Sequence, residues 1–402
     1  MARQQLPPQI KKVELDRKER GKPVVRYQLT VDIGVDPDTG KRKQLRKRFA
    51  TEAEARDELS KVQNAVTAGT YVHNSKTTVA DMIDNYLTSK HALKPSTAAG
   101  YRVSLAPVRQ KLGDKPIQKL TRRHLDELIV ELRAGDLPTL EGNERKPWKA
   151  RTVNQMLTVL GSALDALVKE GVLVRNVAAL IDKLPDERTE SDTWSPEEVE
   201  RFLLESRDDP YLHAWYLALC GLRRGEICGL RWDDIDFDDE LLTIVRSRVS
   251  FGSTTSEGAP KSKRSTRTLP IPEDLAKQLK AARARQAKER LALGEAWTDS
   301  GYVVIDPAGE PLSPGALSSR WVHAVARAKV STIRLHDARH TCATLMHLRG
   351  VPIAVIAAWL GHASAAFTLS RYAHSQDPAM VDAAKLSPIV TIRDNSGASG
   401  GS

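Results

Sequence analysis

Residues 334–374 hold the side chains best suited to chemistry on a phosphate. Five of the ten histidines in the chain lie there, and a histidine can move a proton near neutral pH or donate to a phosphate oxygen. Arg339 is a permanent cation shaped for two phosphate oxygens, and Tyr372 has a hydroxyl that can attack phosphorus. We therefore expect a nucleophile, proton carriers and a cation around one phosphate. The five histidines are His336, His340, His347, His362 and His374.

The pair His336 and His340 also has the spacing of a metal site on one face of a helix. A zinc hydrolase would have Glu after the first histidine, whereas Asp337 and Arg339 stand between the two here. Because a guanidinium is repelled by a dication, we expect no metal. A buried histidine on a helix is the remaining alternative, and it explains His347 better than His336.

The elements that carry these side chains are expected to be helix, turn, helix, turn, helix. Apolar residues at 343–348 indicate the first helix, Gly350 ends it, and Pro352 opens the second. Gly361 closes the second helix, so that His362 follows its C-terminus and Tyr372 lies one element further on.

The segments LHDARHT, LGH and RYAH resemble the C-terminal signature of the tyrosine recombinases, the phage integrase family. The family pattern is His-x-x-Arg, then Leu-Gly-His, then a tyrosine a short distance beyond. Upstream, ALCGLRRGEICGL resembles the first arginine block of the family, with Arg223 at the arginine position and Glu226 at the acidic position that supports the site. One helical turn separates the two, so the carboxylate can hold the guanidinium. Alone, this segment could be an ordinary helix start.

A second upstream segment, PKSKRSTRTLP, resembles the lysine hairpin of the family, with Ser262 in place of the usual Thr. Flanking segments at 241–251 and 267–272 are expected to be strands. The resemblance makes Lys261 the catalytic lysine, with Lys263 as the alternative because the register of this hairpin varies. On the residues alone, the hairpin could be a basic turn that contacts backbone phosphates, which fits Lys263, Arg264 and Arg267.

The resemblance implies a metal-independent and ATP-independent transfer of DNA strands. The two arginines would bind the phosphate oxygens on which charge grows. Tyr372, with an ordinary pKa of about 10, would lose its proton to His336, and Lys261 would protonate the departing 5′ oxygen. A 3′-phosphotyrosyl intermediate would then be attacked by the 5′-hydroxyl of another strand, with no cofactor. The implied catalytic set is Arg223, Lys261, His336, Arg339, His362 and Tyr372, where His362 hydrogen-bonds the phosphate.

Positive charge is concentrated near the N-terminus. The chain carries a net charge of +10, and residues 1–50 hold fourteen Lys or Arg against six acidic residues, which indicates a polyanionic partner. Residues 1–20 are expected to be a polar arm or a disordered segment, and 24–35 and 41–50 are expected to be strands. Thr51 and Glu54 should form the capping box of a helix that continues to about Thr67. The proposed DNA contacts are Lys41, Arg42, Lys43, Arg46, Lys47 and Arg48.

This small basic sheet followed by a helix resembles the arm-binding domain of many integrases, although an RNA-binding module is an alternative for this segment alone. The fold expected for the chain is multidomain α+β. It comprises an arm-type domain at 1–70 with a small sheet and a helix, an all-α core-binding bundle at 78–184, a mainly α catalytic domain with a small antiparallel sheet at 194–390, and a flexible tail at 391–402.

Helix signals support the middle domain. Thr78, Ser96 and Thr121 are expected to cap three helices, and a fourth, at 153–167, should end by Gly171. This pattern predicts a helical bundle and little more. Lys146, Lys149 and Arg151 are candidates for phosphate contacts. Ser195 with Glu198 should cap the first helix of the last domain.

The function expected is that of a site-specific DNA recombinase that integrates or excises a mobile element. The implied partners are double-stranded DNA at core and arm attachment sites, other copies of the chain in a homotetramer on synapsed DNA, and an accessory host factor or excisionase. Three cysteines without metal spacing, no apolar leader and no apolar run of about eighteen residues favour a reducing bacterial cytoplasm, at the nucleoid, and no membrane. The alternatives are a type IB topoisomerase and an inactive DNA-binding relic.

Overall fold

The computed structural model describes residues 5–19, 22–35, 42–68, 71–72, 75–185, 192–252, 254–258 and 266–362. Contacts divide the chain into two units, Met1–Arg188 and Thr189–Ser402. None of the helices in the described ranges is both long enough and apolar enough to cross a bilayer.

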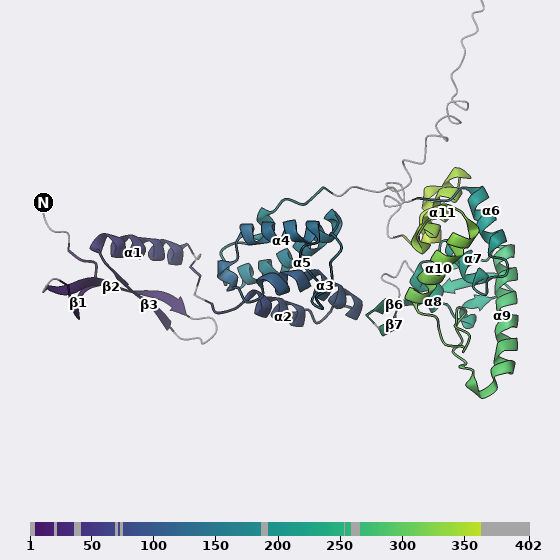
Figure 1. Ribbon diagram of the computed structural model, residues 1–402, viewed down its shortest axis with the longest axis horizontal. Coiled ribbons are helices and arrows are strands. Elements are labelled where there is room, and N and C mark those ends of the chain that lie inside the picture. Colours follow the sequence, from purple (N-terminus) through teal and green to yellow (C-terminus); the bar gives the residue numbers. More distant parts are fainter. Residues whose placement is uncertain are drawn as a thin grey trace, which may run out of the picture. The chain divides into compact units, whose positions relative to one another are not determined.

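The first unit begins with a three-stranded antiparallel sheet of order β1-β2-β3, followed by helix α1 (Figure 1). Helix α1 starts at the predicted capping box, in which the Thr51 side chain accepts from the Glu54 N–H at 3.2 Å. Leu29 and Val31 pack with Ala55 and Leu59 of the helix, so one face of the sheet forms a small core. The elements are β1 (Ile10–Glu19), β2 (Lys22–Val35), β3 (Arg42–Phe49) and α1 (Glu52–Thr67).

Strand β1 corrects the expectation of a polar arm or disordered segment at residues 1–20. Its sequence is mostly charged and carries little strand propensity, but Ile10 pairs with Leu29 and is buried at 3% exposure. Lys11, Lys12 and Glu14 stay exposed. An edge strand tolerates such a charged sequence, and the charges discourage pairing with another chain. The partner strand, rather than local propensity, makes this segment extended.

A bundle of four helices follows, in agreement with the prediction of an all-α segment. Thr78 caps its helix as expected, and Gly171 follows the last helix with φ +72°. Ser96 is not a cap, because Pro95 already occupies the first turn and the helix begins two residues earlier than expected. The apolar faces of all four helices form one core. The helices are α2 (Val79–Ser89), α3 (Pro95–Leu112), α4 (Arg122–Ala134) and α5 (Ala150–Lys169).

The second unit is mainly helical with a small sheet, as predicted. Its antiparallel sheet has the order β4-β5-β8, and β6 pairs with β7 in a separate hairpin. Ser195 caps its first helix through the expected capping box with Glu198. The helices are α6 (Pro196–Glu205), α7 (Leu212–Leu219), α8 (Arg224–Gly229), α9 (Glu273–Leu293), α10 (Pro314–Ala328), α11 (Leu335–Leu348) and α12 (Ile353–Leu360). The strands are β4 (Ile235–Asp236), β5 (Leu241–Ile244), β6 (Ser247–Phe251), β7 (Thr254–Gly258) and β8 (Arg267–Pro270).

The strand expected at 241–251 is divided in two. Its first half, β5, pairs with β8, whereas β6 turns away and pairs with β7, which the sequence did not predict. The backbone of β6 passes close to α8: a Cβ on Gly225 would lie 2.4 Å from Ser247 Oγ and 2.6 Å from the Arg248 carbonyl oxygen. This close packing against α8, which is non-local, accounts for the break.

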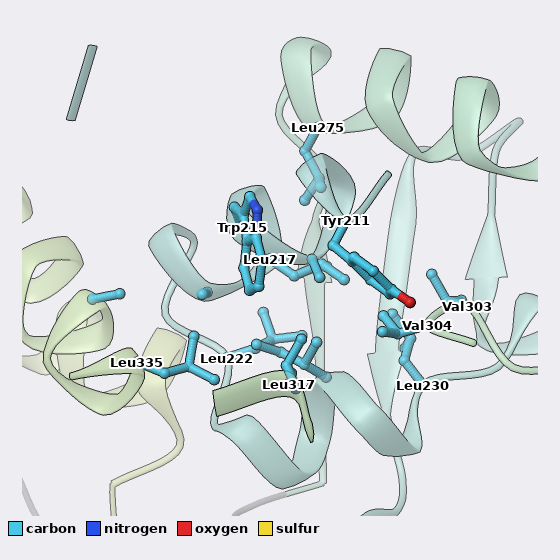
Figure 2. Packing of buried hydrophobic residues seen from close by; sticks show 14 of the residues in the cluster. Tyr211, Trp215, Leu217, Leu222, Leu230, Leu275, Val303, Val304, Leu317 and Leu335 are labelled. Carbon is cyan, nitrogen blue, oxygen red and sulfur yellow. The ribbon is translucent and has the colours of Figure 1, made fainter. Parts of the chain in front are cut away.

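Aromatic packing in the second unit fixes the start of α11. Trp194, Trp215 and Trp321 are fully buried, with ring centroids of Trp194 and Trp321 5.3 Å apart. The Trp321 indole donates to the Ile333 carbonyl at 2.9 Å, and the Trp194 N–H donates to Thr341 Oγ1 at 3.1 Å. Around Trp215, side chains from several elements meet in one core (Figure 2). Helix α11 is therefore held against this aromatic core.

Candidate active site

Three arginines converge on the C-terminal end of α12. Arg267 Nε donates to the Trp359 carbonyl at 2.7 Å, Arg339 Nη2 donates to the Leu360 carbonyl, and Arg223 Nη2 donates to the Gly361 carbonyl at 2.9 Å. The last carbonyls of a helix have no partner within the helix and carry its negative dipole end. Guanidinium groups from β8, α11 and the start of α8 therefore stabilise this helix end.

Arg223 is held by Glu226, as the sequence predicted. Arg223 is the N-cap residue of α8, and its backbone N–H donates to Glu226 Oε2 at 2.9 Å while Nη1 donates to Oε1 at 2.6 Å. The Glu226 side chain is 2% exposed and that of Arg223 is 33% exposed. The guanidinium thus keeps access to solvent while its carboxylate partner is buried.

Arg339 is buried beneath this surface, at 2% exposure. Besides the bond to Leu360, its Nη1 donates to the Gly221 carbonyl at 2.6 Å. Gly221 has φ +90°, and a Cβ there would lie 2.7 Å from Leu360 Cδ2. The turn before Arg223 and the end of α12 are therefore in close contact, and Arg339 bonds to both.

His362 follows α12 directly and lies in the field of these arginines. Gly361 ends the helix with φ +64°, as predicted, and the His362 N–H donates to the Ala357 carbonyl at 2.9 Å. Burial, followed by the charges of Arg339 and Arg223, lowers the pKa of His362 to about 4. The ring is therefore neutral at pH 7 in the DNA-free protein.

His336 lies on the first turn of α11 and remains exposed to solvent. The pKa of its imidazole lies below the ordinary value of 6.5, because protein atoms surround part of the ring and because Arg339 is nearby. Its ring meets that of His340 edge-on, with centroids 5.2 Å apart. In the described ranges, His, Cys, Asp and Glu side chains form no group of three or more that could hold a metal ion.

Four of the six proposed catalytic residues are thus described, and they lie together. Arg223, Arg339 and His362 meet at the end of α12, and the charges of both arginines act on His336 as well as on His362. Such a group of two cations and two neutral imidazoles can bind an anion and move a proton beside it. Lys261 and Tyr372 lie outside the described residues, as do Lys263 and Arg264.

Two family models match the chain. The phage integrase family matches residues 195–378, which include all six proposed catalytic positions, and an arm DNA-binding domain matches residues 16–66. A XerC-like tyrosine recombinase of Caldanaerobacter subterraneus is 29% identical over 92% of this chain and 96% of its own length. Residues 195–378 belong to the phage integrase family. The chain is a tyrosine-type site-specific DNA recombinase.

Other integrases are similar in sequence or fold. The ICEBs1 integrase of Bacillus subtilis is 27% identical over 87% of this chain and 93% of its own length. The structure of the Tn1549 transposon integrase in complex with a circular intermediate DNA matches with a TM-score of 0.62 over 77% of this chain and 99% of that chain, at 20% identity. A lambda integrase tetramer bound to a Holliday junction matches with a TM-score of 0.54 over 91% of this chain and 96% of that chain, at 19% identity. These likenesses show the integrase fold.

The proposed DNA contacts of the arm domain divide between two faces of its sheet. Thr30 pairs with Arg46 and Leu29 with Lys47, so these neighbours on β3 point to opposite faces. Lys47 is on the face covered by α1, where its Nζ lies 2.5 Å from Glu58 Oε1. Arg42, Arg46 and Arg48 share the other face by alternation, Lys43 shares the face of Lys47, and Lys41 lies outside the described residues.

The structure also shows a role for a residue that the sequence left at the DNA surface. The Arg267 side chain is only 7% exposed and donates to both oxygens of Glu226, at 3.2 and 3.0 Å. The sequence did not single out Trp359. Its backbone carbonyl accepts from Arg267, and its indole N–H donates to the Cys220 carbonyl at 2.8 Å. The bundle candidates Lys146, Lys149 and Arg151 lie in the insertion before α5 and at its start, apart from this group in sequence.

Proposed function

We propose that this site cuts and rejoins DNA through attack of Tyr372 on a phosphodiester, with Arg223 and Arg339 stabilising the phosphate. The observation that supports the proposal most is the convergence of both arginines with His362 at the end of α12, beside His336. Negative charge grows on the non-bridging oxygens during the reaction. Cations already fixed in place stabilise that charge without reorganisation.

Each proton has a carrier in this scheme. As the bond between Tyr372 and phosphorus forms, the phenolic proton passes to His336, whose lowered pKa leaves it neutral and able to accept at pH 7. The bond to the 5′ oxygen breaks, and Lys261, or Lys263 in the alternative register, protonates that oxygen. The 5′-hydroxyl of another strand then attacks the 3′-phosphotyrosyl ester, and the protons return. Each step breaks one phosphate ester bond and forms another, so no ATP is consumed.

The exposed face of the N-terminal sheet is the second proposed DNA surface. Arg42, Arg46 and Arg48 line the face opposite α1, and a β-ribbon of this kind can enter the major groove. We propose that residues 1–70 bind arm-type sites, whereas 78–184 and 194–390 each contact the crossover site. Phosphate contacts by Lys146, Lys149 and Arg151 belong to the same proposal.

The assembly on DNA is proposed to be a homotetramer on two synapsed attachment sites, with an accessory host factor or excisionase setting direction. The solved lambda integrase structure is described as a tetramer bound to a Holliday junction, which supports this stoichiometry by analogy of fold. The reaction would integrate or excise a mobile element in the cytoplasm of a bacterial host, at the nucleoid.

Tyr372→Phe tests the proposed function directly. The variant lacks the attacking hydroxyl and nothing else, so cleavage should be abolished while affinity for the crossover site stays within about twofold. With a nicked suicide substrate, the wild type should give a denaturation-resistant protein–DNA adduct. An adduct of equal yield from the variant would show that another residue is the nucleophile.

A plasmid assay separates recombination from relaxation alone. Two attachment sites on one supercoiled plasmid should be recombined by the wild type, and the Phe variant is the matched control. Relaxation without recombinants, on plasmids with or without the sites, would indicate a topoisomerase instead.

A further inference from the structure

We infer that Arg267 is a positioning residue of the catalytic site, which holds Arg223 through Glu226 and the end of α12 through Trp359. The inference rests on the proposed function and deepens it. It replaces the expectation that Arg267 contacts DNA backbone.

The first observation is the set of acceptors around the Arg267 guanidinium. Nε donates to the Trp359 carbonyl, and the two terminal nitrogens donate to the two oxygens of Glu226. The side chain is 7% exposed. A planar guanidinium suits this arrangement of a bidentate carboxylate and a carbonyl, and an ammonium group does not.

The second observation is that Glu226 is shared. Its oxygens accept from Arg267 and from Arg223, and the side chain is 2% exposed. Burial alone would raise the pKa of this carboxyl, but the hydrogen bonds and charge of Arg267 and the charge of Arg223 outweigh burial and hold the pKa below its ordinary value. With a single guanidinium, the buried carboxylate would be only partly compensated. Arg267 therefore keeps Glu226 charged and in place to orient Arg223.

The third observation connects Arg267 with Arg339 and His362. Trp359, which accepts from Arg267, donates to the Cys220 carbonyl, and the adjacent Gly221 carbonyl accepts from Arg339. Arg339 in turn donates to Leu360, two residues before His362. Arg267 is thus one member of a hydrogen-bonded network that fixes both phosphate-binding arginines and the histidine relative to each other.

Arg267→Lys is the decisive variant, because it keeps the charge and loses the bidentate geometry. Single-turnover adduct formation at saturating suicide substrate should slow by on the order of 10- to 10²-fold, as expected when a catalytic group is displaced by about an ångström. The dissociation constant for the crossover site should stay within about twofold. The slope of log affinity against log salt should be unchanged, because each lost phosphate contact would reduce its magnitude by about 0.9.

Arg224→Lys is the matched control. Arg224 is exposed, adjacent to Arg223, and donates to Ser318 Oγ at 3.1 Å; its variant should cleave at the wild-type rate. Glu226→Gln should slow adduct formation like Arg267→Lys, and the double variant should be no slower than the slower single variant, because both changes interrupt one path to Arg223.

Three outcomes would overturn the inference. A shallower salt slope with normal cleavage at saturation would make Arg267 a DNA contact. Additive losses in the double variant would mean that Arg267 does not act through Glu226. Loss of the folded state in Arg267→Lys, seen as thermal unfolding below the assay temperature, would make it a determinant of the fold alone. If the wild type and Arg224→Lys also give no adduct, the proposed function itself fails.

Discussion

At the scale of single residues, the site is defined by an excess of positive charge around neutral histidines. Arg223, Arg267 and Arg339 all donate to the end of α12, and Glu226 is the carboxylate between two of them. This excess of positive charge suits an anion. Burial, followed by the charges of Arg339 and Arg223, lowers the pKa values of both His362 and His336.

The pKa of His362 should change when a phosphodiester binds. In the DNA-free protein its pKa is about 4, so NMR of the imidazole should show a neutral ring down to nearly that pH. A bound phosphodiester places negative charge beside the ring and should raise the pKa. Arg223→Gln should also raise it in the free protein, because one of the charges that lowers it is removed. His362→Gln identifies the resonance, and an unchanged pKa on DNA binding would contradict the scheme.

The same shift gives a direction for stability. The unfolded chain binds the proton of His362 near the ordinary histidine pKa of 6.5, whereas the folded chain binds it only near 4. Between these values the unfolded state holds more protons, so this residue contributes less stability as pH falls through that window. The lowered pKa of Glu226 acts in the same sense at lower pH, since its folded-state interactions are lost when it is protonated.

Sequence motifs predicted which residues form this site, but they did not predict all of the hydrogen-bond partners of these residues. Local spacing predicted a contact between Arg223 and Glu226 and a helix end at Gly361. The structure confirms the contact and the helix end. Arg267 was expected at the DNA surface because it follows a basic turn. Its burial depends on Glu226, 41 residues earlier in the chain, and on Trp359. Such non-local partners are not visible in the spacing of a single sequence.

At the scale of elements, most helix caps and the helix-ending glycines were predictable, whereas part of the strand pairing was not. Thr51, Thr78 and Ser195 cap their helices through residues three positions away, which is local chemistry. Strand β1 and the β6–β7 hairpin depend instead on partners in the folded chain. A charged sequence becomes a strand when a neighbour supplies the hydrogen bonds and a buried position for one apolar residue such as Ile10.

A substitution at Gly221 tests whether the turn before Arg223 must lie in close contact with α12. Gly221→Ala combines a left-handed φ of +90° with a Cβ 2.7 Å from Leu360 Cδ2. The backbone strain alone costs about 1–3 kcal/mol. We expect a lower thermal unfolding midpoint together with slower adduct formation, because Leu360 and the bond from Arg339 must shift.

Gly350→Ala is the matched control for that strain. Gly350 lies between α11 and α12 with φ +79°, and nothing lies within 4 Å of an added Cβ. It should lose a similar amount of stability from the backbone but keep a cleavage rate close to that of the wild type at temperatures where it is folded. Equal effects of the two variants on cleavage would show that the contact with α12 is irrelevant to the site.

At the scale of the whole molecule, the described residues form separate hydrophobic cores. The N-terminal sheet packs with α1, the bundle helices pack with each other, and the second unit has its own core around the buried tryptophans. None of the proposed catalytic residues belongs to the first two. Binding and chemistry should therefore be separable by truncation.

Removing residues 1–70 is the prediction that tests this division. The truncated protein should still form the Tyr372 adduct on crossover-site suicide substrates, while it loses binding to a second, distal class of site. The isolated arm domain should bind DNA with an affinity that falls steeply with salt, because the proposed binding would depend largely on neutralising phosphates. Gel-shift titrations over a salt series measure both.

The two faces of the arm sheet supply the matched variants. Arg46→Ala removes a cation from the face opposite α1 and should weaken arm-site binding and reduce the magnitude of the salt slope by about 0.9. Lys47→Ala removes a cation of the same sign from the adjacent position, where it pairs with Glu58 on the α1 face, and should change the slope little. If both variants reduce the salt slope by the same amount, the two faces of the sheet contribute equally to DNA binding. If the truncated protein binds every site in the attachment region as well as the full chain does, the N-terminal sheet is not an arm-binding domain.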